Sequence, residues 1–60
     1  MKFIMKVAMD NAAFEDDGSE LPRILHKLAD DLERYAMEPG VGFYLLDING
    51  NHVGNAKIIK

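Results

Sequence analysis

The stretch Ser19–Met37, SELPRILHKLADDLERYAM, decides the fold of this chain. Its apolar side chains recur every three or four positions, which is the spacing of one face of an α-helix. This face comprises Leu21, Ile24, Leu25, Leu28, Leu32 and Tyr35, with Ala29 and Ala36 beside it. Such a stripe has to be covered, and in a chain of 60 residues only a small sheet built from the two ends can cover it.

Pro22 indicates where this helix begins. A capping box of Asp17 and Glu20 would leave Pro22 in the second turn, where its ring clashes and its missing N–H costs a hydrogen bond. With Ser19 as the N-cap, Pro22 falls in the first turn, where that donor is not needed. We predict that the helix runs to Met37 and is terminated by the following Glu38-Pro39-Gly40.

Three segments alternate with a period of two and are predicted to be strands. They are Lys2–Met9, Val41–Ile48 and His52–Ile59. Asn49-Gly50 lies between the last two and is a strong hairpin signal. Gly54 predicts a bulge or a close approach of two backbones. The segment Val41–Ile48 is apolar on both faces, so it is expected to be central or covered by a second subunit.

The order β-α-β-β predicts a single α+β domain over residues 1–60, with one amphipathic helix on a three-stranded sheet. Two layouts satisfy the connection rules: the last strand lies between the others in an antiparallel sheet, or the first two strands are parallel neighbours joined by a right-handed crossover. We favour the antiparallel layout, because such a sheet tolerates solvent on one face.

The second face of the sheet is a predicted dimer contact. It carries Ile4 and Ala8 from the first strand and Tyr44 and Leu46 from the second. The chain has no cysteine, so neither a disulfide nor a cysteine-bound zinc stabilises its small hydrophobic core. We therefore predict a homodimer that covers this apolar surface.

The formal net charge of −3 disfavours nonspecific binding to a phosphate backbone, but the charges are unevenly spread. No lysine or arginine lies between Lys6 and Arg23, and that window holds Asp10, Glu15, Asp16, Asp17 and Glu20. Glu15, Asp16 and Asp17 complement the helix dipole at about 0.3–1 kcal/mol each, or the five acids form a patch that binds a partner. The first interpretation is favoured. Arg23, Lys27 and Arg34 make a basic stripe that Asp30 and Asp31 flank, which is typical of a solvated helix face.

We predict no catalytic, cofactor or metal site. Asp47, Asn49 and Asn51 alternate like the start of a calcium loop, but His52 and Ile58 occupy the positions that require glycine and glutamate. A turn in which these side chains bond the local backbone is predicted instead. His26 and His52 have no ligand partner at a fixed spacing. No apolar run reaches the ~18 residues of a membrane span, and the lack of cysteine fits the cytoplasm.

The chain resembles a group of small, mostly uncharacterised proteins of bacteriophages and prophages. The resemblance lies in DNAAFEDD at Asp10–Asp17, in Glu20-Leu21, Arg23–Leu25, Leu28–Asp30 and Leu32-Glu33 of the helix, and in DINGNHVG at Asp47–Gly54. Pro22 and the lysines after Gly54 depart from the pattern of the group. The resemblance implies a viral accessory protein in the bacterial cytoplasm and brings no agreed activity or functional residues.

The sequence is compatible with three functions. The first is a non-enzymatic phage accessory protein that binds a host or viral protein, for example to inhibit a defence or metabolic factor. The second is an acidic mimic of nucleic acid, in which the carboxylates from Asp10 to Glu20 imitate phosphates. The third is a small nucleic-acid-binding protein that uses Arg23, Lys27 and Arg34. We favour the first and expect nucleic acid not to be the main partner.

Overall fold

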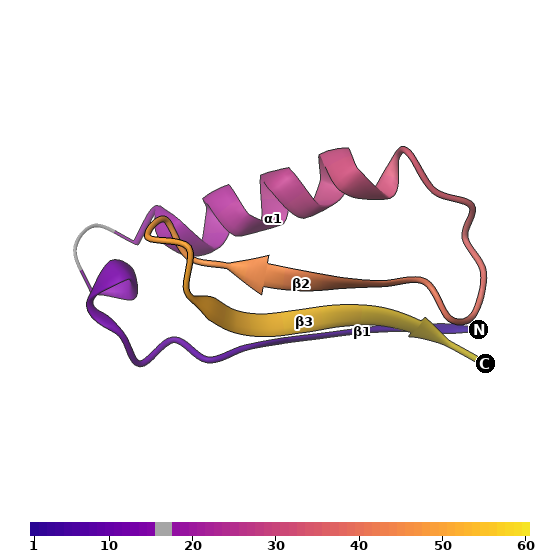
Figure 1. Ribbon diagram of the computed structural model, residues 1–60, viewed down its shortest axis with the longest axis horizontal. Coiled ribbons are helices and arrows are strands. Elements are labelled where there is room, and N and C mark those ends of the chain that lie inside the picture. Colours follow the sequence, from indigo (N-terminus) through magenta and orange to yellow (C-terminus); the bar gives the residue numbers. More distant parts are fainter. Residues whose placement is uncertain (16–17) are drawn as a thin grey trace.

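The computed structural model describes residues 1–15 and 18–60 and has the predicted α+β architecture (Figure 1). Its elements are β1 (Lys2–Val7), a short 3-10 helix η1 (Ala12–Phe14), α1 (Glu20–Leu32), β2 (Gly42–Leu46) and β3 (His52–Ile59). Asp16 and Asp17, two of the acids in the predicted patch, lie outside the described residues. The order of helix and strands is the predicted β-α-β-β.

The sheet is antiparallel with β3 in the centre, so the favoured layout is confirmed and the parallel alternative is wrong. Met5, Ala56 and Phe43 lie level across the three strands. Figure 1 shows α1 running alongside the strands and the two termini at the same end of the molecule. β2 is therefore an edge strand, although its sequence is apolar on both faces.

The core lies between α1 and one face of the sheet. Ile24 and Leu28 of α1 pack against Leu45, Val53 and Ala56 of the sheet. Burying an isoleucine, leucine or valine side chain stabilises a fold by about 1.5–3 kcal/mol. The inward positions of Ile24, Leu28 and Leu45 follow the expected helical and strand periods. Val53 and Ala56 are three residues apart, because an irregularity interrupts the alternation of β3.

The predicted C-terminal end of the helix is wrong, because α1 ends at Leu32 and not at Met37. Thirteen residues give a helix about 20 Å long, which already matches the ~17–20 Å of a strand of five or six residues. The segment after Leu32 still lies against the sheet, since Leu32 and Met37 border one hollow with Phe3 and Ile58. The chain turns after Leu32, and the Tyr35 ring meets Phe43 edge-on at a centroid distance of 5.2 Å.

The buried stripe of α1 is narrower than predicted. Leu25 is 44% exposed, whereas Ile24 and Leu28 are buried. Successive helical residues point about 100° apart, so the sheet cannot cover Ile24 and Leu25 equally. Glu20 takes one of the buried positions at the start of the helix.

Gly54 lies both at a β-bulge and at a close approach of two backbones, the two features predicted from the sequence. Leu45 lies opposite Gly54 and Leu46 opposite His52, so Val53 is the extra residue of a β-bulge. A Cβ atom built on Gly54 would collide with the backbone carbonyl oxygen of Lys6 on β1. Only glycine allows the two strands to approach this closely.

Candidate functional site

Asp47 organises the turn between β2 and β3. Its carboxylate accepts hydrogen bonds from the backbone amides of Asn49 and Asn51 at 2.9 and 2.8 Å. It also accepts from the side-chain amides of Asn51 at 3.1 Å and Asn11 at 2.9 Å. The backbone hydrogen bond from Asn51 is the main reason why the pKa of Asp47 is lowered, against the opposing effect of burial. The predicted local turn is confirmed.

Both carboxylate oxygens of Asp47 thus accept hydrogen bonds from the protein itself. Within the described ranges 1–15 and 18–60, no group of three His, Cys, Asp or Glu residues is arranged to hold a metal ion. Asn11 also connects η1 to the hairpin through this carboxylate. The cluster is therefore a structural anchor for one end of the molecule.

Glu20 is a second buried carboxylate and does not belong to an exposed acidic patch, which corrects that part of the prediction. Its side chain is 5% exposed. One oxygen accepts from Arg23 Nε, and the other accepts from the backbone amide of Ile48 at 3.0 Å. The amide of Ile48 needs an acceptor there, and Glu20 supplies it from the first turn of α1. Asp10 and Glu15 of the predicted patch are exposed.

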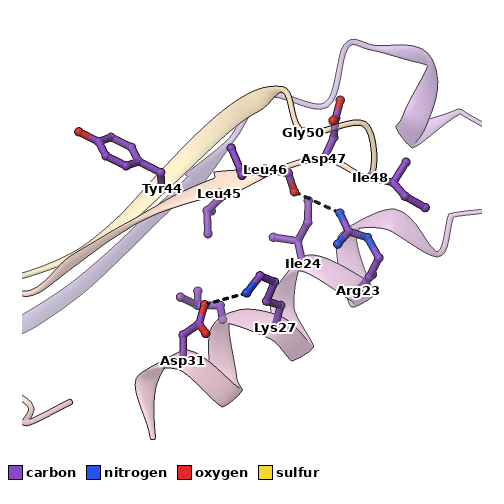
Figure 2. A pocket seen from close by; sticks show the side chains of 11 residues that line it. Arg23, Ile24, Lys27, Asp31, Tyr44, Leu45, Leu46, Asp47, Ile48 and Gly50 are labelled. Carbon is purple, nitrogen blue, oxygen red and sulfur yellow. Dashed lines mark hydrogen bonds and ion pairs between the residues drawn. The ribbon is translucent and has the colours of Figure 1, made fainter. Parts of the chain in front are cut away.

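A groove of about 400 Å³ runs between α1 and the outer edge of β2 (Figure 2). We call it the edge groove. Its lining consists of Arg23, Ile24, Lys27, Leu28 and Asp31 from α1 and of Tyr44–Ile48 and Gly50 from β2 and the hairpin. Ile24, Leu28 and Leu45 are also core residues, so the floor of the groove is apolar. Ile48 stands at the hairpin end and is 70% exposed.

The outer edge of β2 presents backbone hydrogen-bonding groups to the edge groove. The Asp47 amide donates to Asn51 at 2.9 Å and the Val41 carbonyl accepts from Ile58 at 2.9 Å, so these residues face β3. Alternate residues in an antiparallel strand face opposite ways, which directs the backbone groups of Gly42, Tyr44 and Leu46 outward. The carbonyl of Leu46 faces outward as expected, because it accepts from Arg23 Nη2 at 3.1 Å.

The charged rim of the edge groove is balanced. Arg23 is engaged by Glu20, and Lys27 Nζ lies 3.5 Å from Asp31 Oδ2 at the surface. A pair like the second contributes only a few tenths of a kcal/mol. Arg34 lies beyond the end of α1. The predicted basic stripe of Arg23, Lys27 and Arg34 is therefore not one continuous helix face.

The sheet face turned away from α1 is the open face. It carries Lys2, Ile4, Lys6, Gly42, Tyr44, Leu46, His52, Asn55, Lys57 and Ile59. Three residues of the predicted dimer contact, Ile4, Tyr44 and Leu46, lie on it. Ala8 follows β1, where its amide donates to the Val53 carbonyl at 2.7 Å. The strand lysines that share this face were not singled out from the sequence.

The homodimer stays a prediction, and the open face makes its salt dependence testable. Two copies that meet through this face would bring Lys2, Lys6 and Lys57 of each together, and like charges repel. Salt screens that repulsion, so the dimer should strengthen as salt is raised. Sedimentation of the 6.7 kDa chain at low and high salt measures this. A dimer that weakens with salt would have to use another surface.

Sequence reasoning missed the edge groove because its two walls are distant in the chain. The available signal was the strand GFYLL, which has no charged residue on either face. In the described part of the chain, no helix combines the length and hydropathy needed to cross a bilayer. No family model, no curated protein and no solved structure matches this sequence.

Proposed function

We propose that this protein acts by binding another protein, and that the edge groove takes up an extended segment of that partner as an added strand. The observation that carries this proposal is the uncharged outer edge of β2 beside an apolar groove floor. An open strand edge pairs with a foreign strand through main-chain hydrogen bonds, and adjacent pockets select its side chains. β2 offers both an open strand edge and an adjacent apolar groove.

The groove geometry sets limits on the partner segment. Arg23 already occupies the carbonyl of Leu46, so the added strand would pair with the outward groups of Gly42 and Tyr44. Its side chains would alternate, and every second one would lie over Ile24 and Leu28. These inward side chains should be apolar, because the floor beneath them is apolar and the rim charges Arg23 and Lys27 are already paired with Glu20 and Asp31.

The biological setting of the proposal comes from the resemblance to phage-encoded proteins. In that setting the protein is a non-enzymatic accessory protein in the cytoplasm of the bacterial host. Its partner is a viral or host protein, and inhibition of a defence or metabolic factor is the form of action that we favour. We prefer the edge groove to the acidic patch as the contact, since the Glu20 carboxylate is bound within the protein.

A selection experiment with defined variants tests the strand-addition mechanism. A random peptide library is panned against the immobilised protein, and the selected peptides are synthesised and titrated. We expect apolar residues at alternate positions and hydrogen-exchange protection of the amides of Gly42 and Tyr44. Tyr44→Pro removes an outward N–H without removing a bond to β3, and it should weaken peptide binding at least about tenfold.

Tyr44→Leu is the matched control, because it changes the same side chain but keeps the amide. It should bind the selected peptides within about threefold of the original protein. Circular dichroism checks that both variants keep the fold. Selected peptides that bind Tyr44→Pro unchanged, or a library that yields no peptide, would refute the mechanism.

A further inference from the structure

In the described part of the chain, the strands carry lysines but no aspartate or glutamate. These lysines are Lys2, Lys6 and Lys57. Lys6 is level with Tyr44 across Asn55, and the register places all three lysines on the open face. This face is therefore basic, although the whole chain has a formal charge of −3.

An aromatic ring lies on the same face as these lysines, on the edge strand β2. Tyr44 is 79% exposed, and the His52 ring meets it edge-on at a centroid distance of 5.1 Å. Beside Tyr44 is a hollow of about 290 Å³ that Gly42, Asn55 and Lys57 also border. Gly42 has no side chain, so its position leaves room beside the ring. An exposed ring next to such a hollow can stack with a flat, aromatic ligand.

We infer that the open face binds single-stranded nucleic acid, with a base stacked on Tyr44 beside Gly42 and phosphates held by Lys2, Lys6 and Lys57. Charge complementarity requires an anionic occupant. A second copy of this chain brings lysines against lysines. The carboxylates of an acidic peptide supply charge but do not themselves supply an aromatic ring for the hollow, and the bases of a duplex are already stacked on one another. A single strand supplies both the phosphates and an accessible base.

This inference is independent of the proposed peptide groove. It depends on side chains of the open face, whereas strand addition depends on the backbone edge of β2. Tyr44→Leu separates the two, because it removes the ring and keeps the amide. One proposal can therefore fail while the other holds.

Fluorescence anisotropy with labelled oligothymidylate and oligouridylate of about ten nucleotides tests the inference, a length within the usual site sizes for single strands. We expect binding at low salt that weakens as salt rises. Three phosphate contacts predict a slope of about −2 for log K against log salt. A duplex of the same length and a polyglutamate peptide should bind at least about tenfold more weakly.

Variants assign the binding to the open face. Tyr44→Leu should weaken binding about tenfold, and Tyr44→Phe should retain it because the ring remains. Lys6→Gln and Lys57→Gln should each reduce the salt slope by about 0.7. Lys27→Gln on α1 removes the same charge from the other side of the sheet and should change neither the affinity nor the slope.

Three results would overturn the inference. The first is no binding of either oligonucleotide at low salt. The second is equal binding of polyglutamate, which would make the face a site for acidic proteins. The third is an equal effect of Lys27→Gln and Lys57→Gln, which would mean diffuse attraction without a site.

Discussion

Gly54→Ala should destabilise the fold by about 3 kcal/mol, since forcing extra atoms into a packed interior costs 1–3 kcal/mol or more. The added Cβ would overlap the carbonyl oxygen of Lys6 and lie 2.9 Å from its carbonyl carbon and 3.0 Å from Val7 Cα. These are backbone atoms that cannot rotate away, so β1 would have to move off β3. A domain of this size has roughly 3–9 kcal/mol of total stability, so much of it would be lost.

Gly42→Ala is the matched control, because it adds the same methyl group to a strand glycine. Its Cβ would meet the Ala56 carbonyl oxygen at 3.4 Å and Lys57 Cβ at 3.7 Å, which needs little adjustment. The change should be neutral or stabilise the fold by up to about 1 kcal/mol, since alanine restricts the unfolded chain. Urea unfolding followed by circular dichroism measures both variants. Equal midpoints would show that the β1–β3 approach at Gly54 is not restrictive.

Asp47→Ala should lower the thermal midpoint by on the order of 10 °C. The variant leaves the amides of Asn49 and Asn51 without their acceptor and releases Asn11 of η1 from the hairpin. Asp31→Ala is the control, because Asp31 makes one long contact at the surface, with Lys27. It should shift the midpoint by no more than a few degrees. Similar shifts for the two variants would show that the Asp47 cluster is not an anchor.

The lowered pKa of Asp47 also predicts how stability depends on pH. The ordinary pKa of this carboxyl is 3.8, and that of the folded state lies below it. Between the two values the unfolded chain binds more protons, so stability rises with pH in this window. The contribution is fully present above about pH 5 and is lost as pH falls through the folded pKa.

Asp47→Asn isolates this contribution, because other carboxylates also titrate in acid. The stability of the original protein should fall more steeply below pH 4 than that of Asp47→Asn, so the two curves converge. Urea midpoints at a series of pH values measure the difference. Parallel curves would mean that Asp47 titrates alike in the folded and unfolded chain.

Features that depend on residues close together in the chain were predictable from the sequence. The spacing of Ile24 and Leu28 gave the helix and its buried face, and Asn49-Gly50 gave the hairpin. Gly54 indicated the bulge. The helix end was not predictable in this way, because residues beyond Leu32 keep a helical pattern, and Tyr35 reaches Phe43 of β2 from outside the helix.

The candidate sites depend on contacts between distant parts of the chain. Glu20 looks in the sequence like one more acid before a helix, but the Ile48 amide makes it a buried acceptor. Lys6 and Lys57 are separated by most of the chain and lie on one face only because β1 pairs with β3.

The sequence by itself determined the elements, their order and the inward side of each strand, because these follow from local periodicity and turn chemistry. The favoured layout already placed the last strand in the middle, but tertiary structure alone decided between the two layouts, and it alone showed the groove beside β2 and the strand lysines gathered opposite the helix. The physical reason is that strand order and register are set by long-range hydrogen bonding and by packing on Ile24 and Leu28. No local pattern of residues contains that information.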